Sequence, residues 1–403
     1  MAEKQLNILY HFRVRGTGAE GVHIAGIVNG FRALGHNVRL VSPTNADPTA
    51  KTSEETRTDR PTRVITVLLH KLADILPQPF FEIMEFLYNF FAIIKLWKNI
   101  NNNDVDFIYE RYAFFNLAGV LVAKRKKIPL ILEVNELSGH KRIRGQFFVR
   151  LCSVIEKYIL CRSVLVVTVS DFLNRIVSSK IDPQKTNVIT IPNGVPKAWL
   201  ERKISLDEVI NLRKKYNLHG KKVICFVGGL EHWHNFDLLL QAVKTTQDSI
   251  SGVVMMFIGD GPLKNFIQNR SRALALQPDS VLFVGKVPHF DVPAYLKMAD
   301  IAVIPETNDF RSPIKMYEYM AMGLPVVAPK KPAIETAITH KVDGILFEPK
   351  NVQSLAYALL QCLSKDELAK KLGQNALQRV LNNFTWEKHA EHILQTYAHC
   401  KFN

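Results

Sequence analysis

Short apolar runs alternate with longer helix-like stretches along the whole chain, and the alternation starts a second time near the middle. In the first half the apolar runs are residues 6–10, 37–42, 107–109, 129–134 and 164–169. In the second half they are residues 222–227, 252–258, 281–284, 301–304 and 324–328. Continuous apolar strands that alternate with helices are typical of parallel sheets covered on both faces. The pattern predicts an α/β protein of two doubly wound, Rossmann-like domains facing each other across a cleft, with ligand at the carboxyl ends of the strands.

The length of the chain also favours two domains. A chain of 403 residues is too long for one ordinary core and suits two domains of about 200 residues each. Turn-forming residues gather at 193–203, where the alternation restarts. We therefore expect an N-terminal domain over 1–195, a C-terminal domain over 196–383, and a final helix in 384–403 that packs back on the N-terminal domain.

The net charge of +15 lies mainly in the first half, where residues 1–200 hold 27 Lys and Arg against 17 Asp and Glu. Such an excess suits a nucleic acid, an anionic lipid or a phosphate-bearing ligand. No basic stripe interleaved with aromatic residues supports nucleic acid, and we expect none as a partner. The five cysteines are odd in number and lack CxxC spacing, which favours a reducing, cytoplasmic location over a zinc site or a disulfide framework.

The most apolar region is residues 76–100, which is interrupted by Glu82, Glu85 and Lys95. It contains no run of about 20 uncharged apolar residues that would span a bilayer, and the N-terminus lacks the apolar stretch of a signal peptide. We expect a buried or semi-buried helix here, with an interfacial membrane helix as the alternative. The basic run 124–127 is most simply a solvated helix end, and contact with anionic lipid is its alternative. Peripheral contact with the inner face of a membrane therefore stays open.

The segment 311–328 (RSPIKMYEYMAMGLPVVA) combines a helix start with charged side chains. Ser312 is expected to cap the free N–H groups, and Pro313 suits the first helical position. A helix N-terminus at a strand's carboxyl end offers N–H donors and a positive dipole to a phosphate. Arg311 and Lys315 add positive charge on the same turn, and Glu318 is placed to accept hydrogen bonds from sugar hydroxyls. From these residues alone, a phosphate site and an ordinary capped helix are both open.

The same segment closely resembles the C-terminal-domain motif of the family-4 retaining glycosyltransferases, which have the GT-B fold. Further motifs follow the family's order across nearly the whole chain. They are Gly16–Gly21, Val169–Asp171, Pro192–Val195, Phe226–Leu230 with Trp233–Phe236, Phe257–Pro262, Phe283–Val287, Ala299–Pro305 and Phe384–Glu387. Each is weak alone, but together in sequence they are a strong signal.

The resemblance implies an enzyme that moves a sugar from a nucleotide-diphosphate donor to an acceptor hydroxyl with retention of anomeric configuration. Glycan, polysaccharide or glycoconjugate biosynthesis would be its setting, with a sugar, a polysaccharide or a lipid-linked glycan as acceptor. The C-terminal domain would hold the donor and the N-terminal domain the acceptor. Neither a metal nor another cofactor is expected, because the helix dipole and basic side chains neutralise the diphosphate. In such a reaction the leaving diphosphate can deprotonate the acceptor hydroxyl, so no enzymic nucleophile is demanded.

The family's functional positions carry over to this chain as expectations. For donor binding they are Gly16, Gly18, Gly229, Gly259, Lys286, Val287, Arg311, Ser312, Pro313, Ile314, Lys315 and Glu318. As catalytic candidates we take Glu318, Lys315, Asn135 and His234. For the acceptor we take Glu20, His23 and Glu133. Glycine at 16 and 18 would let the backbone approach the sugar and phosphate closely.

Four positions depart from the family pattern. Phe310 stands where a glutamate is usual, Gly229 and His234 stand where a donor-phosphate Arg and Lys are usual, and Asn135 replaces a common histidine. We interpret them as marks of a subfamily in which Arg311, Lys315 and His234 neutralise the diphosphate. An inactive domain would be expected to lose the capped helix and Glu318 as well.

Two other functions are consistent with the same motifs. A nucleotide-sugar epimerase would also bind a nucleotide diphosphate, but it would consume the donor without an acceptor. A non-catalytic protein that binds nucleotide sugars or polyanions would release no nucleoside diphosphate with any acceptor.

Overall fold

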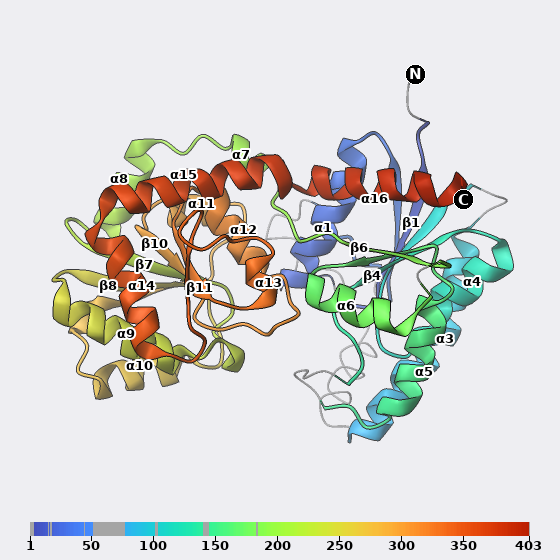
Figure 1. The fold of residues 1–403 in the computed structure, drawn as a ribbon, viewed down its shortest axis with the longest axis horizontal. Helices are drawn as coiled ribbons and strands as arrows, with labels where there is room; N and C mark the ends of the chain where they lie inside the picture. Colours follow the sequence, from blue (N-terminus) through green and yellow to red (C-terminus); the bar gives the residue numbers. More distant parts are fainter. Residues whose placement is uncertain are drawn as a thin grey trace. The chain divides into compact units, whose positions relative to one another are not determined.

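The computed structural model describes residues 4–14, 16, 18–43, 45–50, 77–100, 104–139, 145–182 and 184–402 (Figure 1). The chain divides into two compact units. The first contains residues 1–191 and 389–403, and the second contains residues 192–388. The border thus lies between residues 191 and 192, and each unit is described below by itself. The sequence also predicts a polar, turn-rich loop at 43–63, of which residues 44 and 51–63 lie outside the described residues, as does residue 76 at the start of the apolar region.

The first unit is built on a parallel sheet of six strands in the order β2-β1-β3-β4-β5-β6. The strands are β1 (Asn7–His11), β2 (Asn37–Val41), β3 (Phe107–Arg111), β4 (Leu130–Val134), β5 (Leu165–Thr168) and β6 (Asn187–Thr190). The sequence predicted the first five. It missed β6, a half-exposed edge strand with the sequence NVIT, because only one neighbouring strand covers it and its apolar run is short.

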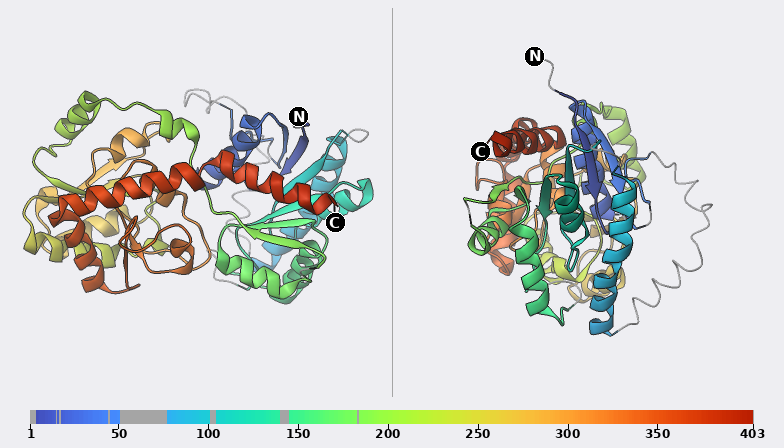
Figure 2. Two further views of the ribbon diagram at one scale, coloured as in Figure 1. Left: turned by 45° about the horizontal axis from the view of Figure 1, so that its top comes forward. Right: turned by 90° about the vertical axis from the view of Figure 1, so that its right-hand side faces the viewer.

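Six helices accompany this sheet in the described part of the first unit. They are α1 (Gly18–Ala33), α3 (Gln78–Lys98), α4 (Ala118–Lys126), α5 (Val149–Leu160), α6 (Asp171–Lys180) and the part of α16 (Trp386–Phe402) from residue 389 onward. The last helix lies along the strands of this unit (Figure 2). Its Tyr397 ring lies 4.9 Å from that of Phe107, and its hydroxyl donates to the carbonyl of Asp106 at 3.2 Å.

The second unit repeats the plan with six parallel strands in the order β12-β11-β10-β7-β8-β9. They are β7 (Lys222–Val227), β8 (Val253–Ile258), β9 (Val281–Gly285), β10 (Ile301–Val303), β11 (Val326–Pro329) and β12 (Ile345–Phe347). The sequence missed β12, an edge strand of three residues. The helices are α7 (Lys197–Glu201), α8 (Leu206–Lys215), α9 (Phe236–Ser249), α10 (Lys264–Ala273), α11 (Val292–Leu296), α12 (Ile314–Ala321), α13 (Pro332–Glu335), α14 (Val352–Ser364) and α15 (Asp366–Asn383), with short 3₁₀ turns at His232–His234 and Pro278–Ser280.

Strand β7 shows why its sequence is apolar at every position after Lys222. Val223 and Cys225 contribute to one hydrophobic core, which also contains residues of α12 and α15. Ile224 and Phe226 contribute to a second core with α9 and α14. Successive side chains of a strand point to opposite faces, so a strand covered on both faces needs apolar residues throughout. The predicted α/β class with two Rossmann-like domains is confirmed.

Helix α3 is semi-buried, as one of the two expectations had it, but the side that faces the protein is its polar side. Its buried positions are Glu82, Glu85, Asn89, Ala92 and Leu96, which recur at helical spacing. Eight large apolar side chains are instead between 40% and 74% exposed, and we call them the apolar stripe of α3. They are Phe80, Ile83, Phe86, Leu87, Phe90, Phe91, Ile94 and Trp97. No helix in the described part of the chain is long and apolar enough to cross a membrane.

Candidate functional site

The start of α12 is open rather than capped. Strand β10 ends at Val303, and the chain reaches α12 at Ile314 through Pro313, whose position at the helix boundary carries no side-chain cap. Ser312, which the sequence predicted as the cap, is buried, and its hydroxyl lies 2.8 Å from the Tyr317 hydroxyl. The first-turn amide of Ile314 therefore has no side-chain cap, in a geometry that suits a phosphate.

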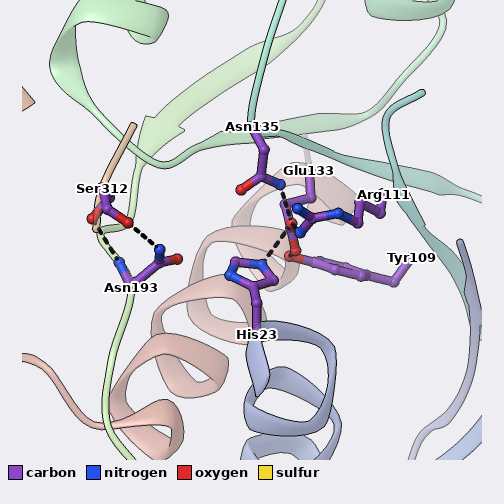
Figure 3. Close-up of polar contacts among 7 residues, drawn as sticks. All are labelled: His23, Tyr109, Arg111, Glu133, Asn135, Asn193 and Ser312. Atoms are coloured by element: carbon purple, nitrogen blue, oxygen red, sulfur yellow. Dashed lines mark hydrogen bonds and ion pairs between the residues drawn. The ribbon is translucent and has the colours of Figure 1, made fainter. Parts of the chain in front are cut away.

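Asn193 explains why the Ser312 side chain points away from the helix start. Its side-chain amide donates to the Ser312 carbonyl at 2.6 Å, and its backbone N–H reaches the Ser312 hydroxyl at 3.4 Å (Figure 3). These bonds hold the loop before α12 against the turn that contains the motif Pro192–Val195 (PNGV). The predicted cap was wrong because the Ser312 hydroxyl bonds with the Tyr317 hydroxyl and the Asn193 backbone N–H instead of a first-turn amide of α12.

Lys315 points back from the first turn of α12 to the end of β7. Its Nζ lies 3.9 Å from the centroid of the Phe226 ring and 3.4 Å from Nε2 of His234. Gly228 adopts a φ of +124°, which favours glycine, and a Cβ there would lie 2.9 Å from this Nζ and would displace the amine. Burial lowers the pKa of Lys315 to about 7, against a smaller opposing effect of Glu318.

His234 is neutral in this arrangement. It is buried, and that burial together with the charge of Lys315 lowers its pKa to about 2. An ammonium group can only donate, so Nε2 accepts from Lys315 and Nδ1 carries the proton, facing the Glu306 carbonyl at 3.4 Å. Unliganded His234 therefore orients Lys315 and adds no positive charge of its own.

The lowered pKa of Lys315 predicts a pH-dependent affinity for an anionic diphosphate. Below pH 7 the Lys315 amine is charged in the free protein. Above pH 7 it is mostly neutral, so it must take up a proton when the anionic diphosphate binds. The dissociation constant for a nucleotide sugar should therefore be flat on the acid side and rise by up to about tenfold per pH unit above pH 7. Titration calorimetry in buffers of different ionisation enthalpy would also register the proton uptake. In Lys315→Arg the side chain stays charged, so the pH dependence of the dissociation constant and the proton uptake should both disappear. A dissociation constant of the wild type that does not change above pH 7 would contradict the prediction.

Glu318 has a partner that the sequence did not predict. Its carboxylate is buried, and Oε1 lies 2.7 Å from Nε2 of His289, which donates to it. The His289 ring is 4.6 Å from the ring of Trp199 at a tilt of 35°. In the sequence, the role of His289 is indicated only by its position two residues after the motif Phe283–Val287 (FVGKV), beyond the end of β9.

The remaining predicted donor residues surround this cluster less tightly. Arg311 is half-buried, 5.9 Å from the ring of Phe310, and its charge contributes to the lowered pKa of His234. Lys286 is exposed after β9, and Val287 packs partly against the core. Gly229 and Gly259 lie in the loops that follow β7 and β8.

The carboxylates nearest the missing family glutamate are engaged elsewhere. Phe310 itself is buried. Lys331 pairs with Glu306 at 2.7 Å and with Asp309 at 3.5 Å. Both acids are therefore ion-paired with the same lysine.

A second group of predicted residues meets at the end of β4 in the first unit. Glu133 is fully buried, and His23 of α1 approaches its Oε1 at 2.7 Å (Figure 3). Asn135 donates to the same oxygen. The sequence missed two further donors, Arg111 at 2.8 Å and the Tyr109 hydroxyl at 2.9 Å. Because β3 and β4 are neighbours in the sheet, these side chains meet only once the strands pair.

Four donors are about as many as a carboxylate accepts. Burial alone would raise the pKa of Glu133, but His23, Arg111 and Asn135 outweigh it and hold the pKa well below its usual range. Glu133 is therefore ionised and internally satisfied, and it fixes the orientation of His23 and Asn135. Glu20, in contrast, is exposed on the first turn of α1, and Gly16 and Gly18 adopt positive φ angles of 72° and 61° just before it.

Removing the Glu133 carboxylate should destabilise the first unit. In Glu133→Ala the buried Arg111 and His23 lose their partner, and the expected cost is about 3–5 kcal/mol in the free energy of unfolding. Urea unfolding followed by circular dichroism measures it, with the exposed Glu20→Ala as control. Because the folded pKa is depressed, this contribution is present above the ordinary carboxyl pKa and is lost as pH falls through the folded value. A cost below about 1 kcal/mol would show that the network contributes little.

In the described ranges, no group of three or more His, Cys, Asp or Glu side chains could hold a metal ion.

Two family models match the chain and between them span most of it. The model described as Glycosyltransferase Family 4 matches residues 20–199, and the model described as Glycosyl transferases group 1 matches residues 208–379. The Glycosyltransferase Family 4 model therefore matches the first unit and the start of the second, and the Glycosyl transferases group 1 model matches the second unit alone.

Among curated proteins, the chain is 28% identical to spore coat protein SA of Bacillus subtilis, over 58% of this chain and 64% of the relative. It is 26% identical to the alpha-monoglucosyldiacylglycerol synthase of Streptococcus pneumoniae, over 71% of this chain and 65% of the relative. The matched regions thus span just under two thirds of these relatives.

Solved structures agree on the fold. Anabaena Alr3699/HepE in complex with UDP superimposes with a TM-score of 0.69 at 16% identity, covering 98% of this chain and 100% of that one. Sucrose-phosphate synthase of Thermosynechococcus elongatus gives a TM-score of 0.70 at 18% identity, covering 98% and 99%. Taken with the two family models and the paired six-stranded sheets, these findings show that the chain belongs to the family-4-type glycosyltransferases with the GT-B fold.

Proposed function

We propose that this protein transfers a sugar from a nucleotide-diphosphate donor to an acceptor hydroxyl, with retention of configuration and without a metal ion. The observation that carries the proposal is the buried Lys315 beside the uncapped start of α12. A half-buried amine with a pKa near 7 is held where its charge is costly unless an anion arrives. Support for the nucleotide comes from the HepE neighbour, whose complex contains UDP.

The donor would be held by the second unit. Its diphosphate would lie at the first turn of α12, between the free amides and the Lys315 amine, which together stabilise the charge that develops as the sugar leaves. Glu318 would exchange its bond to His289 for bonds to the ribose hydroxyls. His234 would gain a proton on binding only if the diphosphate raises its depressed pKa by several units.

The acceptor would be held by the first unit, near His23 and Asn135. Glu133 positions both side chains by hydrogen bonds, which leaves Asn135 able to contact a sugar hydroxyl through its carbonyl oxygen. Acceptors of three classes fit: a sugar, a polysaccharide or a lipid-linked molecule. The name of the pneumococcal relative specifies a glucosylated diacylglycerol, which supports a lipid acceptor and, with it, peripheral contact with a cytoplasmic membrane face.

A nucleotide-sugar panel tests this proposal. Thermal shift identifies the donor, and nucleoside diphosphate release is then measured with each acceptor class, with and without a chelator. We expect release that depends on acceptor and is unchanged by chelator, with the product's anomeric configuration, read by NMR, matching the donor's. Donor consumption without acceptor would instead indicate an epimerase, and binding without any turnover would indicate a non-catalytic protein.

A further inference from the structure

Helix α3 is oriented with its polar side inward, and specific bonds fix that orientation. The Glu82 carboxylate accepts from the backbone N–H groups of Phe147 at 2.6 Å and Phe148 at 2.8 Å. Arg13 pairs with Glu85 at 2.6 Å. Asn89 donates to the carbonyl of Phe115 and accepts from another backbone N–H. Turning the helix to bury the apolar stripe would break these buried bonds, so the stripe must face outward.

Exposed apolar side chains also occur on a second segment of this unit. Glu82 joins the first turn of α3 to the residues that lead into α5. Apolar side chains are exposed at Phe147 in that segment and at Leu151 and Val154 on α5. An exposed apolar stripe as large as that of α3 marks an interaction site.

The charges around the stripe have one sign. All three carboxylates of α3, α4 and α5, those of Glu82, Glu85 and Glu156, are buried. The exposed charged side chains on these helices and at the end of α4 are basic. They are Lys98, Lys124, Arg125, Lys127, Arg150 and Lys157.

The stripe ends where the basic cluster begins. Lys126 places its Nζ 4.2 Å from the centroid of the Trp97 ring, so the C-terminal ends of α3 and α4 bring an indole and several cations together. Indole rings and basic side chains favour the headgroup level of a bilayer, while phenylalanine side chains favour the acyl boundary just below it.

From this arrangement we infer that the apolar stripe of α3, with the apolar residues of α5 and the basic end of α4, docks the protein on an anionic lipid bilayer. The helix lies in the interface and does not cross it. The inference identifies the surface behind the membrane contact proposed above, and it does not depend on the transfer reaction. The exposed charged side chains described on α3, α4 and α5 are all basic, and basic side chains beside an apolar stripe match anionic headgroups above acyl chains.

Vesicle flotation with the full chain tests the inference. We expect binding to vesicles of phosphatidylcholine with phosphatidylglycerol, much weaker binding to phosphatidylcholine alone, and weakening by salt. The double variant Phe90→Ser/Phe91→Ser should bind about tenfold or more weakly. The matched control is Leu206→Ser in the second unit, whose side chain is 74% exposed, the same as Phe91. The variant Lys124→Gln/Arg125→Gln/Lys127→Gln should lose the preference for anionic vesicles, and Lys370→Gln/Lys371→Gln on α15 should keep it.

Fluorescence separates insertion from loose adsorption. Anionic vesicles should shift the tryptophan emission to the blue, and Trp97→Phe should abolish that shift while Trp233→Phe, in the second unit, retains it.

The inference is overturned if the wild type does not float, or if the two controls lose binding as much as the α3 variants. It is also overturned if Phe90→Ser/Phe91→Ser instead halves the molecular mass in solution, which would identify a second copy as the occupant, or lowers the melting temperature without vesicles, which would identify a segment of the same chain. Nucleotide-sugar titration of the same samples reports on the donor site separately, so either proposal can fail alone.

Discussion

Replacing Lys315 with alanine is expected to lower kcat by about 10²- to 10³-fold. The amine belongs to the first turn of α12 and lies 3.4 Å from a histidine that is neutral and contributes no charge. Without it, the amides of α12 alone would face the charge on the leaving diphosphate. Steady-state measurement of nucleoside diphosphate release with the donor and acceptor identified by the panel gives kcat directly.

Folding should survive this substitution, because the desolvation cost that it removes exceeds the loss of the long 3.4 Å hydrogen bond to His234. Lys315→Ala should therefore melt at or above the wild-type temperature. The exposed Lys370→Ala on α15 is the matched control and should keep full turnover. Wild-type turnover in Lys315→Ala would remove the basis for placing the diphosphate at α12.

Glu318→Ala should reduce kcat/KM by about 10²- to 10³-fold. A buried carboxylate that bonds two ribose hydroxyls contributes two charge-assisted hydrogen bonds, and alanine leaves both hydroxyls without a partner in the pocket. The effect should be visible in donor affinity as well as in turnover. Titration of the nucleotide sugar and steady-state kinetics measure the two components.

His289→Ala distinguishes the two roles that Glu318 can have. If Glu318 binds the donor directly, removing His289 frees the carboxylate and should change kcat/KM far less than Glu318→Ala does. Equal losses in the two variants would show that Glu318 acts by holding His289, which stacks on Trp199. The exposed Glu335→Ala serves as the control for a glutamate lost elsewhere in the second unit.

The comparison of sequence and structure is instructive at α12 and α3. The sequence located α12 and its charged residues, because strand, loop and helix signals are local. It misassigned Ser312 as a cap, since the hydroxyl bonds with Tyr317 and Asn193, the latter more than 100 residues away. It predicted a buried or semi-buried helix at α3 and did not indicate which side is buried, since a hydrophobic pattern shows two faces of a helix but not which one meets the protein.

The sequence by itself determined the α/β class, the two-fold repetition of the plan, and the position of Lys315 and Glu318 on one helix, because these depend on periodicity and on spacing within single elements. It stays a prediction that the two domains face each other across a cleft, with the donor bound by one and the acceptor by the other. Only the tertiary structure decided how these side chains are partnered. Glu133 accepts hydrogen bonds from His23, Arg111, Tyr109 and Asn135. Glu318 pairs with His289, and Lys315 lies against Phe226 with its pKa lowered. Those facts depend on burial and on contacts between strands and helices distant in the chain, and desolvation and Coulomb energies exist only once these elements have packed.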